Sequence, residues 1–257
     1  MLPGWSDRPF ISLEFNKAMM KKHKIEVCYS PALFPFYENR DAVVVVTDIL
    51  RASSAIVTAF MNGVERIIPV GTLEEAKALK DQGFMVAAER DGIVRDFADF
   101  GNSPYNFSPD RVKGRQIVYS TTNGTNAINL ASSGSEVLIG AYLNISALAK
   151  HIKEAGKDLL ILCAGWKNKF NLEDTLFAGA LSQQVLEDDQ FYTICDATLG
   201  AMDLYEAAQG DMMAYIEKVA QRHRLKKNNL DDVIGYCHES DLTDLIPVLN
   251  GDHLVSL

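Results

Sequence analysis

The chain has 257 residues, of which 47% are apolar, 23% are charged and eight are proline. This composition excludes a disordered tail protein, a collagen-like fibre and a disulfide scaffold. Lys and Arg number 25 against 34 Asp and Glu, and the resulting net charge of −9 disfavours non-specific binding to nucleic acid or to an acidic membrane. We therefore expect a globular protein with no nucleic-acid partner and no membrane partner.

Short apolar runs alternate along the chain with longer stretches of helical periodicity. In chain order, strands are expected at 25–29, 43–47, 66–70, 85–88, 116–120, 136–139, 159–163 and 191–194. Helices are expected at 53–61, 73–80, 125–131, 145–153, 172–186, 199–209, 212–222 and 231–237. The alternation predicts an α/β fold of three layers (α/β/α), in which helices cover both faces of a mostly parallel sheet.

No linker or shift in composition divides the chain, so residues 1–257 are expected to form one compact domain. A weak internal repeat begins at Val43 and again at Gln116. Each unit reads as strand, polar turn, helix, glycine and strand, followed by a helix that Thr72 or Asn144 opens. Any two β-α-β units could look alike in this way. A genuine repeat would bring two similar turns to one site.

The first of these turns is TDILRASS, at 47–54. In open α/β sheets, ligands bind beyond the carboxyl ends of the strands. There the Asp48 carboxylate can hold a metal ion, and the Arg51 guanidinium can clamp a phosphate. Ser53 and Ser54 stand where a helix N-terminus offers amides to an anion. The alternative is that Asp48 and Ser53 only cap the helix, with Arg51 at the surface.

The second turn is STTNGT, at 120–125. The hydroxyls of Thr121, Thr122 and Thr125, the amide of Asn123 and the flexible backbone of Gly124 suit an oxyanion such as phosphate. The turn lacks the spacing and the lysine of a nucleotide P-loop. A well-capped helix start explains the same residues without any ligand.

Charged and polar residues follow two further strands. Glu173 and Asp174 begin a helix, where carboxylates complement the helix dipole even without a function. Lys167 and Lys169 precede them, and oxygen ligands beside cations suit a Mg²⁺–phosphate site.

The segment from 90 to 115 has no clear periodicity, and loops of this length are often functional. Glu89 and Arg90 stand at its start, where a strand is expected to end. Asn102 and Ser103 lie in its G-N-S-P turn, which could also be purely structural.

Several other chemistries are disfavoured. Cys28, Cys163, Cys195 and Cys237 lie far apart in the sequence, without the C-x-x-C spacing of zinc or redox sites, and are expected to be thiols in a reducing cytoplasm. No apolar run approaches the ~18 residues of a membrane helix, and residues 1–10 lack the pattern of a secretory signal. Neither the G-x-S-x-G motif of serine hydrolases nor the G-x-G-x-x-G motif of dinucleotide-binding folds is present.

Six short motifs occur in order along the chain: DILRASS (48–54), AERDG (88–92), DFGNSP (99–104), TTNGT (121–125), LED (172–174) and Asp196-Ala197. Through them the chain resembles the 2-phosphosulfolactate phosphatase family. The resemblance implies an α/β fold of two similar, intertwined halves, starting here near 43 and 116. It also implies a Mg²⁺-dependent enzyme that converts 2-phospho-3-sulfolactate to 3-sulfolactate and phosphate, a step towards coenzyme M.

The same resemblance implies roles for single residues. Mg²⁺ is expected to bind a subset of Asp48, Glu89, Glu173 and Asp174. The expected catalytic residues are Asp48, Arg51, Glu173 and Asp174. Substrate binding is expected from Ser53, Ser54, Arg90, Asn102, Ser103, Thr121, Thr122, Asn123, Gly124, Thr125, Lys167 and Lys169. Either water or the Asp48 carboxylate attacks phosphorus, and the lack of a second carboxylate two residues after Asp48 favours water.

Departures from the family pattern leave the organic part of the substrate open. Ser53 and Ser54 stand where the family usually has threonines, and the loop at 166–170 is bulky and basic. The alternatives are a phosphatase for another small phosphorylated hydroxy acid and a non-catalytic protein that binds a phosphorylated metabolite. A homo-oligomer is compatible with the sequence.

Overall fold

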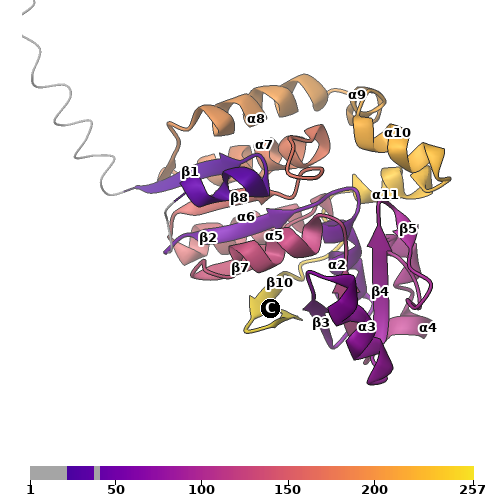
Figure 1. Ribbon diagram of the computed structural model, residues 1–257. Coiled ribbons are helices and arrows are strands. Elements are labelled where there is room, and N and C mark those ends of the chain that lie inside the picture. The colour runs from indigo at the N-terminus through magenta and orange to yellow at the C-terminus, as the bar shows by residue number, and fades with distance from the viewer. Residues whose placement is uncertain (1–21, 38–40) are drawn as a thin grey trace, which may run out of the picture.

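The computed structural model describes residues 22–37 and 41–257 (Figure 1). Its strands are β1 (His23–Cys28), β2 (Val43–Thr47), β3 (Arg66–Pro69), β4 (Met85–Arg90), β5 (Ile93–Val94), β6 (Gln116–Ser120), β7 (Glu136–Ile139), β8 (Leu159–Cys163), β9 (Phe191–Tyr192), β10 (Pro247–Asn250) and β11 (His253–Ser256). Its α-helices are α2 (Ala52–Met61), α3 (Leu73–Asp81), α4 (Pro109–Val112), α5 (Gly124–Ala131), α6 (Ile145–Ala155), α7 (Leu172–Leu186), α8 (Asp196–Ala208), α9 (Met212–Ile216), α10 (Ala220–Lys227) and α11 (Ile234–Cys237). Short 3-10 helices are η1 (Pro31–Phe36), η2 (Pro104–Asn106), η3 (Tyr142–Asn144) and η4 (Asp231–Val233). Residues 1–10, where no secretory signal is expected, lie outside the described part of the chain.

The strands form one mixed, mostly parallel sheet in the order β5-β4-β6-β3-β11-β10-β7-β2-β8-β1-β9. It contains a smaller parallel group, β4-β6-β3, and a larger one, β7-β2-β8-β1-β9. The antiparallel hairpin of β10 and β11 joins the two groups by pairing with β7 and β3. The α/β class is therefore as expected, but the hairpin and the two-residue β5 are not, because strands this short show too little periodicity in sequence.

The two units that begin at Val43 and Gln116 exchange strands between these groups. In the first unit β2 lies in the larger group, whereas β3 and β4 lie in the smaller one. In the second unit β6 lies in the smaller group, whereas β7 and β8 lie in the larger one. As a result β2 lies between β7 and β8, and β6 lies between β3 and β4. Each unit thus supplies the strand that fills the gap between two strands of the other.

Alternate residues of the central strands face two different cores. Val43 and Val45 of β2 pack in the core that contains α6, α7 and α8. Val44 and Val46 pack in the core that contains α2 and α5. Because successive side chains of a strand point to opposite faces, a strand that is apolar throughout needs cover on both faces, and this sheet has it.

The helix expected over 212–222 is divided into α9 and α10. Asp211 caps α9 by accepting a hydrogen bond from the Ala214 amide at 2.9 Å. Val219 is extended and buries its side chain, which ends the helical path before α10 begins. The strand expected at 191–194 is also shorter, since β9 pairs with β1 only opposite His23 and Lys24.

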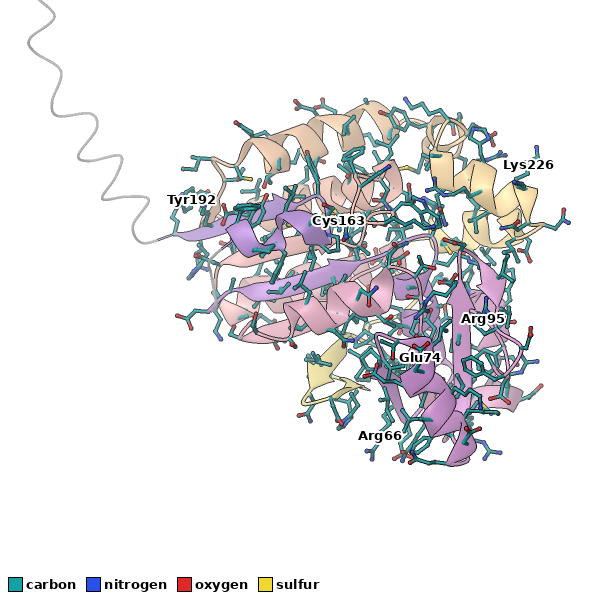
Figure 2. All side chains as sticks on the ribbon, in the orientation of Figure 1. Arg66, Glu74, Arg95, Cys163, Tyr192 and Lys226 are labelled. Atoms are coloured by element: carbon teal, nitrogen blue, oxygen red, sulfur yellow. The ribbon has the colours of Figure 1, made fainter. Side chains whose placement is uncertain are left out.

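None of the described helices has the length and apolar composition needed to cross a membrane. All four cysteines are free thiols, and three of them are buried. Figure 2 shows Cys163 among the strands of the larger group.

Candidate active site

A narrow cleft of about 20 Å³ opens where β2, β4 and β8 end, bounded by the turns that follow β2, β6 and β8 and by α10. Six of its lining residues are expected site residues: Asp48, Arg51, Glu89, Asn102, Thr122 and Asn123. Five were not anticipated: Leu50, Gly92, Trp166, Gln221 and Leu225. Its place beyond the carboxyl ends of parallel strands is the usual ligand position in open α/β sheets.

The turn after β2 fixes Asp48 by hydrogen bonds to its own helix. The Asp48 amide donates to Ser53 Oγ at 3.1 Å, and the Ala52 amide donates to Asp48 Oδ1 at 3.3 Å. Ser54 Oγ donates to the Ile49 carbonyl at 2.9 Å. Both serines are buried and hydrogen-bonded within the turn, Ser53 to Asp48 and Ser54 to Ile49, and neither lines the cleft.

The turn after β6 is closed by two buried threonines. The Thr121 amide donates to Thr125 Oγ1 at 3.1 Å, and the Thr125 amide donates to Thr121 Oγ1 at 3.2 Å. Thr122 and Asn123, between them in sequence, line the cleft. Asn123 Oδ1 also accepts the Lys167 amide at 2.9 Å, which ties this turn to the loop after β8.

The first two turns meet at Gly124. A Cβ atom at Gly124 would lie 2.5 Å from Ala52 Cβ and 3.0 Å from Asp48 Oδ2. Because only glycine permits this approach, the start of α5 lies directly against the start of α2. One turn from each unit of the repeat thus reaches the same site.

The third turn, between β8 and α7, presents two carboxylates. Asp174 Oδ1 accepts the Ile49 amide at 2.9 Å, and Asp174 Oδ2 accepts the Gly165 amide at 3.1 Å and Asn171 Nδ2 at 2.8 Å. Asp174 therefore joins the first turn to the third. Asn171 Nδ2 also donates to Glu173 Oε1 at 3.2 Å, whereas Glu173 Oε2 is buried without a hydrogen-bond partner.

Burial and mutual repulsion raise the pKa values of Asp48, Glu173 and Asp174. Burial raises the pKa of Glu173 to about 7, and the Asp48 charge adds to the rise. Burial and the Glu173 charge raise the pKa of Asp174 to about 8. Burial, followed by the Asp174 charge, also raises the pKa of Asp48 well above its ordinary value. Since an ordinary carboxyl titrates near pH ~4, these raised pKa values mean that attraction to Arg51 and Arg224 does not offset burial and the repulsion between the carboxylates.

Arg51 is the buried cation of the cleft. Its residue is only 4% exposed, and its Nη2 donates to Asn102 Oδ1 at 2.7 Å. Burial lowers the pKa of Arg51, and the nearby Glu89 charge opposes that change. No carboxylate of the described residues forms a salt bridge with it, so its other N–H groups are available to an anion.

Glu89 is held by donors on both of its oxygens. Oε1 accepts the Thr122 amide at 2.8 Å, and Oε2 accepts the Gly92 amide at 2.6 Å. The Thr122 hydroxyl lies 3.2 Å from each oxygen. These contacts use Glu89 to fix the turn after β6.

Several expected substrate ligands lie elsewhere. Arg90 Nη2 donates to the Gly71 carbonyl at 3.1 Å and to Ser120 Oγ at 3.0 Å, and its residue does not line the cleft. Ser103 precedes η2 and is likewise absent from the lining.

The two lysines of the loop after β8 also lie outside the lining. Lys167 Nζ pairs with Asp91 Oδ1 at 2.7 Å, and both side chains are about half exposed. The Lys169 carbonyl accepts the Trp166 amide at 2.9 Å, which closes the loop.

Helix α10 closes the remaining side of the cleft. Gln221 Nε2 donates to the Leu50 carbonyl at 3.0 Å, and Gln221 Oε1 accepts Arg224 Nε at 2.6 Å. The Arg224 guanidinium carbon lies 4.2 Å from the centre of the Trp166 ring. In sequence these residues belong to the charged run QRHRLKK, which reads as a solvated helix face. The basicity of that run, unusual in an acidic chain, was the sequence signal that could have indicated a role for α10 at the cleft.

The four expected metal ligands differ in what they can still bind. Among residues 22–37 and 41–257, no three His, Cys, Asp or Glu side chains are grouped as a ready-made metal site. Both oxygens of Asp174 and of Glu89 accept N–H donors, whereas Asp48 lines the cleft and Glu173 keeps an unpartnered oxygen. Mg²⁺ commonly takes one or two carboxylates together with water and substrate phosphate. Asp48 and Glu173 fit that donor set.

The profile of the 2-phosphosulpholactate phosphatase family matches residues 28–252. The chain belongs to this family. It is 35% identical over 210 residues to a probable 2-phosphosulfolactate phosphatase of Caldanaerobacter subterraneus subsp. tengcongensis, covering 80% of this chain and 87% of that protein. It is 34% identical to a protein of the same name from Clostridium novyi, over 87% of this chain and 96% of that one. A third such protein, from Thermotoga maritima, is 34% identical over 82% of this chain and 90% of its own length.

Membership in the 2-phosphosulfolactate phosphatase family confirms the resemblance that the six motifs indicated, and all six lie inside the matched residues. The family implies a phosphorylated small molecule as substrate. In this member, five of the six motifs supply residues that line the cleft or hold its turns.

Proposed function

We propose that this protein is a Mg²⁺-dependent phosphatase that hydrolyses 2-phospho-3-sulfolactate to 3-sulfolactate and inorganic phosphate. The observation that carries the proposal is a cleft lined by Asp48 and by the buried Arg51, which has no salt-bridge partner among the described residues, in a chain of this family. Asp174, bonded to the amide of Ile49, is buried behind the same turn. Buried charges are costly, and a protein that keeps them unpaired usually uses them.

The phosphate binds between Arg51 and the start of α5. Asn102 fixes the Arg51 guanidinium through the 2.7 Å hydrogen bond, and the guanidinium offers its other donors to phosphate oxygens. Asn123 and Gly124 begin α5, whose N-terminal amides favour an anion. Thr121 and Thr125 contribute indirectly by keeping that helix start in place.

Asp48 and Glu173 would hold the Mg²⁺ ion, which would neutralise charge on the phosphoryl oxygens. The unpartnered Glu173 Oε2 and the raised pKa values of both carboxyls support this assignment. Binding a divalent cation there displaces protons, so affinity for the ion rises with pH. Asp174 acts as a positioning residue, since its bonds to the Ile49 and Gly165 amides set the spacing of the two turns.

Hydrolysis breaks the bond between phosphorus and the ester oxygen and forms a bond between phosphorus and a water oxygen. The water gives up a proton and the leaving oxygen gains one. We assign the attack to water, because Asp48 has no second carboxylate two residues on and its Oδ1 already accepts the Ala52 amide. Acid-quenched single turnovers test this assignment by mass spectrometry: phosphate covalently attached to Asp48 would refute it.

The test of the function is phosphate release from 2-phosphosulfolactate, beside 2-phospholactate, phosphoglycerate and p-nitrophenyl phosphate, each with Mg²⁺ and with EDTA. We expect turnover that requires Mg²⁺ and is fastest on the sulfonated substrate. Turnover of other phosphoesters alone would show that the proposed substrate is wrong and that the protein is still a phosphatase. Ligand-induced stabilisation without any phosphate release would overturn the enzymatic role in favour of binding.

A further inference from the structure

A cation on α10 stands beside the cleft with unused hydrogen-bond donors. Arg224 Nε donates to Gln221 Oε1 at 2.6 Å, and the guanidinium carbon lies over the Trp166 ring, 4.2 Å from the ring centre. Gln221 and Trp166 both line the cleft. Within the described residues, no carboxylate forms a salt bridge with Arg224 and no acceptor other than Gln221 takes its N–H groups.

The other cations near the cleft are assigned to the phosphate or bonded within the protein, apart from the exposed Lys169, which does not line the cleft. Arg51 lies at the floor with Asn102, next to the carboxyls. Lys167 pairs with Asp91 at 2.7 Å, and Arg90 donates to backbone carbonyls outside the lining. A substrate with a further acidic group therefore meets Arg224 as a cation beside the cleft that forms no salt bridge in the described residues, although the Glu173 charge acts on it.

The sequence of α10 explains how Arg224 reaches this place. Gln221, Arg224 and Leu225 are three and four residues apart, so they share one face of the helix. Gln221 and Leu225 are buried on the cleft, and the Gln221 bond to the Leu50 carbonyl anchors that face to the first turn. Lys226 lies on the outer side of α10, where Figure 2 shows it pointing into solvent.

We propose that Arg224, which lies over Trp166, binds one of the acidic groups that the substrate carries besides phosphate, and that it is a specificity-determining residue for phosphomonoesters with such a group. A guanidinium offers two parallel donors to a carboxylate or sulfonate, and an aromatic face fixes its plane. This inference rests on the proposed function for the identity of the ligand.

The experiment compares Arg224→Gln with Lys226→Gln, which removes the same charge from the outer side of the same helix. The substrates are 2-phosphosulfolactate, 2-phospholactate and isopropyl phosphate, which carry two, one and no acidic groups besides phosphate. For Arg224→Gln we expect kcat/KM on the sulfonated substrate to fall on the order of 10²-fold, and on isopropyl phosphate by less than about threefold. If kcat/KM on 2-phospholactate falls as much as on 2-phosphosulfolactate, Arg224 contacts the carboxylate. If it changes as little as on isopropyl phosphate, Arg224 contacts the sulfonate.

Turnover of isopropyl phosphate also shows that the variant is folded. A second variant, Trp166→Leu, leaves Arg224 present but removes its stacking surface, and it is expected to lose selectivity in the same direction by about fivefold. Equal loss on all three substrates in Arg224→Gln would overturn the proposal, because it would make Arg224 a support of the cleft only. Unchanged selectivity would overturn it as well.

Calorimetric binding of 3-sulfolactate and of inorganic phosphate separates this inference from the proposed function. We expect Arg224→Gln to weaken sulfolactate binding by at least about tenfold and to leave phosphate binding unchanged. This result would support Arg224 even if the wild-type protein released no phosphate, whereas sulfolactate affinity equal to the wild type would refute the assignment.

Discussion

Single buried charges define what the cleft can do. Asp48, Glu173 and Asp174 are each less than a tenth exposed, and so is Arg51. Desolvation of a charged group costs several kcal/mol unless a partner compensates it. Hydrogen bonds compensate Asp174 on both oxygens, but Glu173 keeps an oxygen without any partner. Because this buried oxygen has no hydrogen-bond partner, a bound cation would stabilise Glu173 more than Asp174.

Loss of Arg51 is predicted to remove phosphate recognition. Arg51→Ala is expected to lower kcat/KM by roughly 10²–10³-fold, because the guanidinium stabilises charge on the phosphoryl oxygens inside a desolvated cleft. Steady-state phosphate release measures the effect. The control is Arg66→Ala, a partly exposed arginine that does not line the cleft and that Figure 2 shows far from Lys226, and it is expected to leave the rate unchanged. A rate near the wild-type value for Arg51→Ala would contradict its role.

The raised carboxyl pKa values predict that stability without a cation falls as pH rises. Glu173 titrates near pH ~4 when unfolded and about 7 when folded, so the folded protein binds the extra proton between these values. The stabilising contribution is complete below the unfolded pKa and is lost as pH rises through the folded pKa. Asp174, with a folded pKa of about 8, adds in the same direction.

Urea denaturation in EDTA is therefore expected to give a lower free energy of unfolding at about pH 8.5 than at about pH 5. Glu173→Gln, which cannot ionise, is expected to show a shallower fall. Mg²⁺ at the higher pH is expected to restore stability to the wild type and not to this variant. Equal pH dependence in both proteins would show that Glu173 ionises normally.

At the scale of elements, the site depends on how closely two helix starts approach each other. The first turns of α2 and α5 come from different units and touch at Gly124, opposite Ala52. Asp174 adds the third turn through the Ile49 amide. The strand exchange between the units is what brings these segments to one edge of the sheet, since β2 and β6 each lie between two strands of the other unit.

Gly124→Ala is predicted to separate the two turns. Its Cβ would lie 2.5 Å from Ala52 Cβ, and relieving such an overlap typically costs about 1–3 kcal/mol. We expect lower thermal stability and a large loss of phosphatase rate, because Asp48 Oδ2 must also shift. Gly235→Ala serves as the matched control, since no atom lies within 4 Å of its Cβ position in α11. Unaltered activity in Gly124→Ala would show that the turns tolerate separation.

Over the whole molecule, the C-terminal hairpin makes the two parallel groups one sheet. β10 pairs with β7 of the larger group, and β11 pairs with β3 of the smaller one. Leu254 of β11 is fully buried in the core shared with α2 and α5. The last strands of the chain therefore hold in place the groups that carry opposite sides of the cleft.

Leu254→Ala is predicted to destabilise the whole protein by about 2–5 kcal/mol, the usual cost of a large cavity in a core. Chemical denaturation followed by circular dichroism measures this loss. The control is Leu257→Ala, whose side chain is largely exposed three residues later, and its free energy of unfolding is expected to stay within about 0.5 kcal/mol of the wild type. A small effect of Leu254→Ala would mean that the hairpin contributes little to joining the groups.

The sequence alone determined the class of the fold, eight of the eleven described strands and the three strand-to-helix turns, because these depend on local apolar periodicity and on turn chemistry. It also determined the family, since six short motifs recur in order. Tertiary structure decided which polar residues face the cleft. Ser53, Ser54, Thr121 and Thr125 are buried in their own turns, because a hydroxyl can satisfy the adjacent backbone as readily as a ligand.

Only the tertiary structure showed that α10 borders the cleft and that the β10–β11 hairpin joins the two groups of strands. Gln221 and Arg224 lie more than 150 residues from Leu50 in sequence, and no local pattern encodes a contact over that separation. β10 begins at Pro247, and a proline weakens the local sequence pattern of a strand. Local periodicity fixes what an element is, whereas packing between distant elements fixes which of its residues meet the substrate.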